Sequence, residues 1–143
     1  MTLPTTKPHG AHMGEIYADL TLTNVFQKKS VRIRALVDTG TKWMVITPAV
    51  AKELGYDIEE LETRNVALAD GSRRPFPEVS RSLELRFHPE PDAQPDRDIN
   101  FPAIVMGDQC LMGHMALQAL DLIVDFTQHR VKGQHEGGAV YRA

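Results

Sequence analysis

The sequence predicts a mostly β domain, a small closed or nearly closed barrel that carries two short helices. Three observations support this class. Many short segments alternate apolar and polar residues, turn residues separate these segments, and only two segments have a helical pattern. A chain of 143 residues, 42% of them hydrophobic, suits one domain with a substantial core.

The first strand pair is expected around a polar turn. Residues 14–22 alternate apolar and polar side chains, and residues 31–37 do the same before turning apolar. The polar stretch 24–30 separates them. The apolar segment 43–46 then predicts a short buried strand.

A short helix and a second hairpin are expected next, because turn and cap residues mark their ends. Thr47 can cap the helix, Pro48 suits its first turn, and Gly55 stops it. Further along, the pair Asp70-Gly71 predicts the tight turn of a hairpin.

The second half of the chain is expected to hold three more strands and one more helix. The strands are placed at 79–87, 101–106 and 122–126, the helix at 115–120, and an exposed acidic loop at 88–98. We interpret residues 1–13 as a disordered leader or cloning tag, residues 14–130 as the single domain, and residues 131–143 as a flexible C-terminal tail.

The composition argues against several function classes. A net charge of −3 gives no electrostatic footprint for nucleic acid. No apolar run approaches the roughly 20 residues that span a bilayer, so no membrane partner is expected. The single cysteine, Cys110, excludes an internal disulfide and fits a reducing, cytoplasmic location. The histidines lack metal-ligand spacing, and we expect neither a metal nor another cofactor.

The tripeptide Asp38-Thr39-Gly40 is the strongest functional signal. It follows the apolar end of the strand predicted at 31–37 and precedes the buried strand predicted at 43–46. A carboxylate between two buried strands is costly to ionise unless it is hydrogen-bonded or has a chemical role. Asp38 is therefore the candidate catalytic residue.

Three segments in this order resemble the retropepsin-like aspartic proteases of the bacterial single-domain type. They are Ala35-Leu36-Val37-Asp38-Thr39-Gly40-Thr41, the flap-like Leu68-Ala69-Asp70-Gly71-Ser72, and Leu111-Met112-Gly113 with the helix and the strand Leu122-Ile123-Val124-Asp125 that follow it. The resemblance covers nearly the whole folded part. It implies an acid-protease barrel and an aspartic endopeptidase that cleaves polypeptides.

The resemblance also implies a homodimer. Peptide hydrolysis requires a base and an acid, which two neighbouring carboxylates that share one proton can supply together. Pepsin-like proteases carry two Asp-Thr-Gly motifs in one chain, whereas this chain has one. The second carboxylate would then come from an identical chain across a two-fold axis.

The resemblance assigns roles by position. Asp38 would be the acid and base, Thr39 would hydrogen-bond across the two-fold axis, and Gly40 would let the backbone approach the carboxylate closely. Thr41 is expected to donate a hydrogen bond to the Asp38 carboxylate. Gly113 would support the catalytic loop from below. The flap that closes over the substrate would be formed by Ala69, Asp70 and Gly71.

Two departures from the family pattern leave an alternative open. His114-Met115 follow the glycine of the second signature, where many retroviral enzymes have Arg and then Asp or Asn, and the flap is polar at Arg73 and Arg74. The alternative is a catalytically silent module of the same fold that binds peptide or dimerises. The intact Asp-Thr-Gly favours the peptidase.

Other conspicuous residues have simpler interpretations. Asp125 is expected at a strand end or turn, and Cys110 is expected to be a buried small hydrophobic residue. Trp43 is expected in the core or at the barrel mouth. The methionines Met106, Met112 and Met115 are expected in the core.

Overall fold

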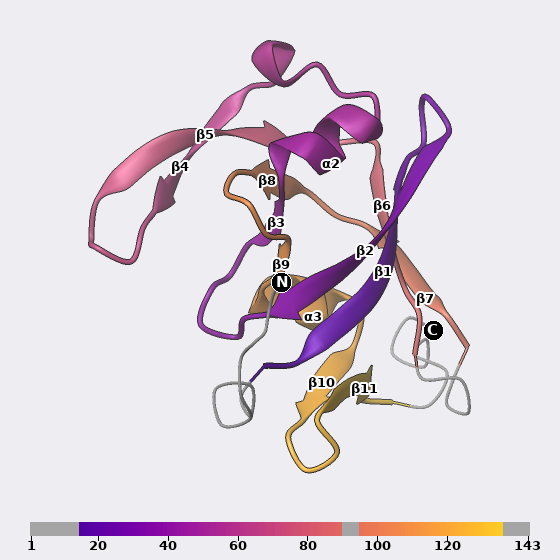
Figure 1. Cartoon of the computed structure of the whole chain (residues 1–143). Helices are drawn as coiled ribbons and strands as arrows, with labels where there is room; N and C mark the ends of the chain where they lie inside the picture. Colours follow the sequence, from indigo (N-terminus) through magenta and orange to yellow (C-terminus); the bar gives the residue numbers. More distant parts are fainter. Residues whose placement is uncertain (1–14, 90–94, 136–143) are drawn as a thin grey trace, which may run out of the picture.

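A computed structural model of the chain describes residues 15–89 and 95–135 (Figure 1). Its strands are β1 (Tyr17–Asn24), β2 (Lys29–Val37), β3 (Met44–Ile46), β4 (Thr63–Ala67), β5 (Arg73–Val79), β6 (Leu83–Phe87), β7 (Arg97–Asn100), β8 (Ala103–Val105), β9 (Leu111–Met112), β10 (Leu122–Asp125) and β11 (Arg130–Gly133). The helices are α2 (Pro48–Glu53) and α3 (His114–Ala119), with a 3-10 turn, η1, at Ile58–Glu60. The predicted leader, residues 1–13, lies outside the described residues.

Within the described residues, nine strands form one curled sheet in the order β4-β5-β8-β3-β9-β2-β1-β6-β7, and β10 pairs with β11. The predicted mostly β class with two short helices is confirmed, and the sheet has the form of a half-barrel. β9 lies between β2, to which it is parallel, and β3, to which it is antiparallel. This insertion brings the end of β2 next to the segment that begins at Gly113.

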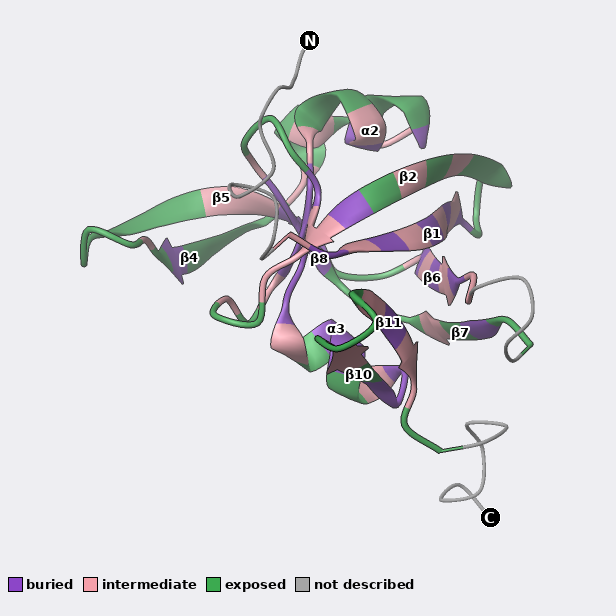
Figure 2. Ribbon diagram, turned by 60° about the horizontal axis from the view of Figure 1, so that its bottom comes forward, coloured by how far each residue is buried: buried purple, intermediate pink, exposed green. Residues whose placement is uncertain are grey.

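The core is built on the alternation of β1. Every second residue from Ile16 to Leu22 is buried, and the residues between them are half-exposed (Figure 2). β1 pairs with β2 on one side and with β6 on the other, so that Leu22 lies opposite Leu85. The helices contribute buried residues such as Leu54 and Leu117 to the same apolar cluster. Burial of these side chains is the main favourable term in folding.

The predicted ends of α2 are confirmed. Thr47 Oγ1 accepts a hydrogen bond from Val50 N at 3.2 Å, and Pro48 occupies the first turn, where no intrahelical donor is needed. Gly55 follows the helix with a φ of +89°, a conformation that favours glycine.

Two strands lie where the sequence predicts irregular structure, and one expected strand is interrupted. β7 overlaps the loop predicted at 88–98 and pairs with β6. β11 occupies the start of the tail predicted at 131–143 and pairs with β10. The strand predicted at 79–87 divides between β5 and β6, because Ser82 between them has a φ of +68°. Such short strands take their stability from partners rather than from their own periodicity.

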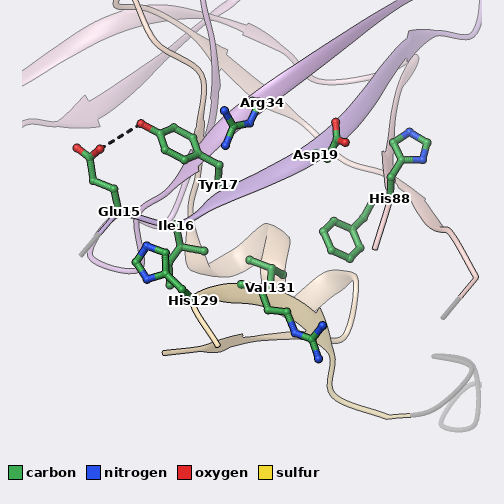
Figure 3. A pocket seen from close by; sticks show the side chains of 10 residues that line it. Glu15, Ile16, Tyr17, Asp19, Arg34, His88, His129 and Val131 are labelled. Carbon is green, nitrogen blue, oxygen red and sulfur yellow. Dashed lines mark hydrogen bonds between the residues drawn. The ribbon is translucent and has the colours of Figure 1, made fainter. Parts of the chain in front are cut away.

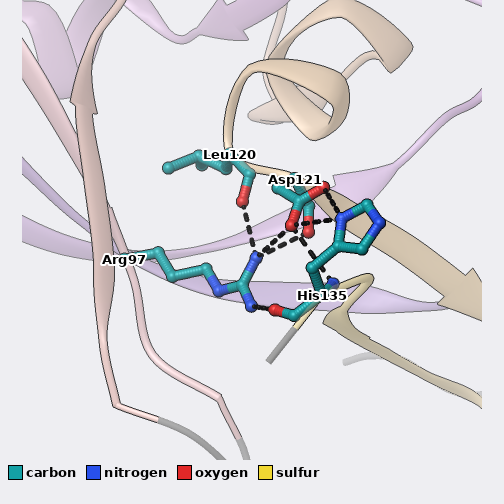
Figure 4. Close-up of polar contacts among 4 residues, drawn as sticks. All are labelled: Arg97, Leu120, Asp121 and His135. Carbon is teal, nitrogen blue, oxygen red and sulfur yellow. Dashed lines mark hydrogen bonds and ion pairs between the residues drawn. The ribbon is translucent and has the colours of Figure 1, made fainter. Parts of the chain in front are cut away.

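The C-terminal strand is held by a buried ionic cluster (Figure 4). The Arg97 guanidinium comes from β7. Its Nη1 donates to the Leu120 carbonyl at 3.1 Å and to Asp121 Oδ2 at 3.2 Å. Its Nη2 donates to the His135 carbonyl. His135 N donates to Asp121 Oδ2 at 3.1 Å. Arg97 and Asp121 are each 8% exposed. Residues 134–135 are therefore tied to the sheet and to the end of α3.

The hairpin of β4 and β5 projects from the body of the sheet (Figure 1). Leu68 N donates to Ser72 O at 2.8 Å, and Glu78 N donates to Glu62 O at 2.9 Å. The even-numbered residues of β5 therefore direct their N–H groups toward β4. Pro75 and Pro77 stand at the alternate positions, which explains how a strand accommodates two residues without an N–H.

Candidate active site

Asp38 follows β2 directly and is held there by β9. Leu36 N donates to the Cys110 carbonyl at 3.0 Å, and Asp38 N donates to the Met112 carbonyl at 3.0 Å. These bonds continue the parallel β2–β9 ladder up to the aspartate itself. The position of the Asp38 backbone is thus fixed by the centre of the sheet and not by a free loop.

The loop after Asp38 turns back on the aspartate. Thr41 N donates to the Asp38 carbonyl at 3.1 Å, and Gly40 N donates to Asp38 Oδ1 at 3.1 Å. Asp38 is half-buried, whereas Thr39 and Gly40 are exposed. The backbone hydrogen bond orients one carboxylate oxygen, and the described residues provide no hydrogen-bond donor to the other. Asp38 Oδ2 can therefore face a water, a substrate or a second carboxylate.

Gly113 supports this loop through direct backbone contact. Gly113 N donates to the Trp43 carbonyl at 3.0 Å, and His114 N donates to the Thr41 carbonyl at 2.9 Å. A Cβ at residue 113 would lie 2.4 Å from Trp43 O and 2.6 Å from Thr41 O. Real carbon atoms do not approach carbonyl oxygens so closely, so only glycine fits here. The sequence-based prediction for Gly113 agrees with this geometry.

Within the single chain, Gly40 and Thr41 both contact Asp38 through their backbone N–H groups. A Cβ at Gly40 would lie 3.4 Å from Asp38 Oδ1, which is ordinary van der Waals contact, so the chain alone does not demand glycine. The expected hydrogen bond from the Thr41 hydroxyl to the Asp38 carboxylate is not formed among the described residues. The reason is that Thr41 meets Asp38 through its backbone N–H, which closes the turn onto the Asp38 carbonyl.

A cleft of about 470 Å³ opens beside Asp38. Its lining is mostly apolar. The segment from the catalytic loop to β3 contributes Trp43, β9 contributes Leu111, and the flap hairpin contributes Val66 and Leu68. Val66 is 3% exposed and packs with Val45 and Ile104 in a second, smaller core. Trp43 was expected in the core or at the barrel mouth and Leu68 in the flap-like segment, whereas the sequence did not point to Val66 as a cleft residue. Met106, which was expected in the core, also lines the cleft.

The predicted flap residues divide into two groups. Ala69 lines the cleft, while Asp70 and Gly71 form the turn at the hairpin tip. Asp70 Oδ1 accepts hydrogen bonds from Ser72 Oγ at 2.6 Å and from Ser72 N at 2.9 Å, and these bonds hold the pKa of Asp70 below its usual range. Gly71 has a φ of +90°, as the turn requires. Asp70 therefore has a structural partner at the tip.

A second, smaller cavity of about 210 Å³ lies on the Thr39 side of the catalytic loop. It is lined by Asp38 and Thr39 together with Ile16, Val124 and Phe126. Phe126 follows β10 and is 71% exposed. An exposed phenylalanine beside the predicted two-fold contact gives this side of the loop an apolar surface.

A third cavity lies away from Asp38 (Figure 3). It measures about 240 Å³ and is lined by Glu15, Tyr17, Arg34 and His129, among others. Tyr17 Oη donates to Glu15 Oε1 at 3.2 Å, and the Arg34 guanidinium lies 4.5 Å from the centre of the Tyr17 ring. Since Asp38 is absent from its lining, this cavity is not part of the candidate active site.

The remaining sequence candidates have structural roles. Asp125 Oδ1 accepts hydrogen bonds from Thr127 N and Gln128 N at 3.0 and 3.1 Å, which confirms the turn role. The backbone bond from Gln128 is the main reason that the pKa of Asp125 lies below its usual value. Cys110 is buried as expected, and burial raises the pKa of its thiol. Trp43 is half-buried at the mouth of the cleft.

Comparison with known proteins agrees with this site. A family model described as aspartyl protease matches residues 24–94, which include Asp38 and the flap. No curated protein matches the chain in sequence.

No helix among the described residues is long and apolar enough to cross a membrane.

Two solved structures share the fold. A retropepsin-like aspartic protease from Rickettsia conorii has a TM-score of 0.55 and 20% identity, over 78% of this chain and 77% of that one. The retroviral protease-like domain of Ddi1 from Leishmania major has a TM-score of 0.54 and 13% identity, over 85% of this chain and 89% of that one. Residues 24–94 thus match the aspartyl protease family model, and the chain has the fold of retropepsin-like aspartic proteases.

Proposed function

We propose that this chain is an aspartic endopeptidase that hydrolyses polypeptides as a homodimer. The observation that carries the proposal is the position of Asp38. It lies at the end of a central strand, its Oδ1 is oriented by Gly40 N, and it opens into an apolar cleft that the flap hairpin covers. An extended polypeptide would occupy the cleft as an added strand.

The proposed reaction uses two Asp38 carboxylates that share one proton. The ionised carboxylate takes a proton from water as the water oxygen bonds to the peptide carbonyl carbon. The protonated carboxylate gives its proton to the carbonyl oxygen, so that a tetrahedral diol forms. Transfer of a proton to the peptide nitrogen then breaks the C–N bond and releases an amine and a carboxylic acid. No other catalytic group is needed.

The second carboxylate would be Asp38 of the partner subunit, because each chain carries one Asp-Thr-Gly. Two observations support an interface on this side of the molecule. Thr39 is exposed beside Asp38, and the cavity next to it is bordered by the exposed apolar ring of Phe126. Burial of such an apolar patch against its own copy is typical of symmetric dimers.

Cleavage of a peptide library between about pH 4 and 7 tests the proposal, because a dyad that shares one proton is active in that range. The matched control is Asp38→Asn, which replaces the carboxylate by a group of the same shape. We expect cleavage by the wild-type protein and loss of at least nine-tenths of it in the variant. Far-ultraviolet circular dichroism of both proteins checks that the fold is unchanged.

The alternative is a silent module that binds peptide without hydrolysis, and the polar, arginine-bearing flap is the observation in its favour. Binding of library peptides by a wild-type dimer that cleaves none of them, across the whole pH range, would establish this alternative. Substantial residual cleavage by Asp38→Asn would instead move the catalytic role to another residue.

A further inference from the structure

We propose that the cleft selects polypeptides that carry an acidic side chain close to the apolar residue at the cleavage site. The selecting feature is a row of cations and aromatic rings that runs from the catalytic loop to the flap, formed by Lys42, Trp43, Arg64, Phe76 and Arg74 and called here the cation–aromatic row. The inference rests on the proposed peptidase function and names its substrate class.

The first part of the row joins the catalytic loop to the flap. The Trp43 ring lines the cleft beside Asp38. Lys42 Nζ lies 4.8 Å from the centre of this ring, and Arg64 Cζ, on β4, lies 5.5 Å from it. Cations at these distances from an aromatic ring are attracted by its electron density. One ring therefore holds a lysine of the loop and an arginine of the flap.

The second part of the row lies on the cleft side of the flap. In the β4–β5 register, Arg64 is opposite Phe76 and Val66 is opposite Arg74. Residues directly opposite each other in an antiparallel pair share one face, and so do residues two apart in a strand. Val66 is buried and lines the cleft, so Arg64, Phe76 and Arg74 share the cleft-facing side. Arg74 Cζ lies 5.4 Å from the centre of the Phe76 ring.

The charges of this row are only partly compensated. Arg64 Nε binds Glu78 Oε2 at 2.9 Å, and Glu78 is 9% exposed, so this pair is neutral within the flap. For Lys42 and Arg74, no carboxylate of the described residues lies within ion-pair distance. The other acid of the hairpin, Asp70, accepts its hydrogen bonds from Ser72. In a chain whose net charge is −3, two cations without an ion-pair partner among the described residues thus lie next to residues that line the apolar cleft, Lys42 beside Trp43 and Arg74 opposite Val66.

This arrangement defines the chemistry of the ligand. An extended peptide directs every second side chain to the same side, with a repeat of about 7 Å. An apolar side chain in the cleft would place the side chain two residues away against the rim where Arg74 lies. Guanidinium groups bind carboxylates through paired, charge-assisted hydrogen bonds. Glutamate or aspartate at that position is therefore the preferred residue.

The experiment compares three fluorogenic peptides that are identical except at one position, two residues away from an apolar residue at the cleavage site. That position carries Glu, Gln or Lys. Two such sets are used, one with the variable position N-terminal and one with it C-terminal to the cleavage site. For the wild-type protein, we expect kcat/KM to be about tenfold higher for Glu than for Gln, which corresponds to one charge-assisted hydrogen bond, and lowest for Lys. Most of the difference should lie in KM. Equal kcat/KM for the three peptides would overturn the selectivity while leaving the peptidase function intact.

Arg74→Gln is the informative variant, because Arg74 is exposed and its replacement does not disturb the core. We expect it to reduce the preference for Glu over Gln to about twofold or less. Arg81→Gln is the matched control, since Arg81 is also exposed but lies beyond the end of β5. It should keep the full preference. Arg74→Glu should reverse the order and favour the Lys peptide. An unchanged preference in both Arg74 variants would contradict the proposal.

Binding measurements separate this inference from the peptidase function. Fluorescence anisotropy with the Asp38→Asn protein reports affinity for the same peptides without cleavage. Preferential binding of the Glu peptide supports the selectivity even if the wild-type protein cleaves nothing. Displacement of that peptide by a short single-stranded oligonucleotide at equal concentration would show a general anion site, and would overturn selection of acidic polypeptides.

Discussion

Gly113 sets how closely helix α3 approaches the catalytic loop. Its backbone N–H and the missing side chain allow the Trp43 and Thr41 carbonyls to pack directly against it. Gly40 lies on the other side of the same loop and has room for a methyl group. Two glycines that flank one aspartate thus have different physical requirements.

Gly113→Ala should therefore lower the free energy of unfolding by roughly 2–3 kcal/mol, because the added carbon must displace backbone. Activity should fall with it, since the carbonyls displaced belong to the loop that carries Asp38. Chemical denaturation measures the first effect and peptide cleavage the second. Gly40→Ala is the control and should change the free energy of unfolding by less than about 1 kcal/mol. Equal destabilisation by the two substitutions would show that the difference in space has no energetic effect.

At this scale the sequence predicts some site residues and misses others for a clear reason. Asp38 and Gly113 stand in local motifs whose neighbours reveal them. Trp43 and Arg64 come together only when the flap folds over the catalytic loop, and no local pattern records that contact. The Thr41 hydroxyl was assigned from type and proximity alone, and the turn geometry uses its backbone instead.

Among the elements, the cluster of Arg97, Asp121 and His135 connects β7, the end of α3 and the residues after β11. Burial opposes ionisation of Asp121, but hydrogen bonds from His135 and Arg97 outweigh it, and the pKa of Asp121 is held below its usual value of 3.8. Stability contributed by such a group is complete above 3.8 and is lost as the pH falls through the lower pKa of the folded state.

Asp121→Asn should cost about 3 kcal/mol of unfolding free energy at pH 7, because it removes the buried carboxylate that pairs with both the Arg97 guanidinium and His135. The difference from the wild-type protein should shrink as the pH falls below 3.8 and through the lower pKa of the folded state, where Asp121 in the folded protein becomes protonated. Asp98→Asn is the control, since the Arg86–Asp98 pair is exposed at 3.5 Å and should contribute less than about 1 kcal/mol. A difference for Asp121→Asn that does not change with pH would assign the effect to packing.

The flap hairpin offers a second test at this scale. Its outer part is paired only within the hairpin and has few buried residues, so we expect the amides near its tip to exchange hydrogen faster than those of β1. A peptide-like inhibitor that binds in the cleft should slow exchange there several-fold and leave β1 unchanged. Equal exchange at the tip with and without inhibitor would contradict the flap assignment.

Elements that carry their own start and stop residues could be predicted from the sequence. The hairpin of β1 and β2, helix α2 and the turn of the flap all have local caps, glycines or long alternation. β7 and β11 have four residues each and become strands because Leu85 and Val124 offer them a partner. Four residues contain too little alternation to reveal this in advance.

For the whole molecule, the proposed function and the proposed assembly would use the same surface. Phe126 is exposed next to Thr39, on the side where the second Asp38 of the proposed dimer would approach. Phe26, which is 78% exposed, lies in the turn at the other end of β2. The order of the strands in the sheet could not be derived from periodicity. The resemblance to a family implied an acid-protease barrel without a strand order, and the solved structures share the fold.

Phe126→Ser should shift the protein from dimer to monomer in sedimentation velocity at micromolar concentration and reduce cleavage in proportion, because it removes apolar area from the proposed interface. Phe26→Ser, a matched substitution of an equally exposed ring, should leave the sedimentation coefficient unchanged. A wild-type protein that is monomeric at high concentration and nonetheless active would contradict the shared dyad.

The two prolines of β5 also affect how the protein behaves at high concentration. A hairpin that projects into solvent is a site where strands of other molecules can add, which is the first step of edge-to-edge aggregation. At Pro75 and Pro77, the outer edge of β5 has carbonyl groups but no N–H groups to complete such a ladder. The outer edge of β5 can therefore stand away from the body of the sheet without pairing with strands of neighbouring chains, which favours colloidal solubility of a protein whose cleft is open on that side.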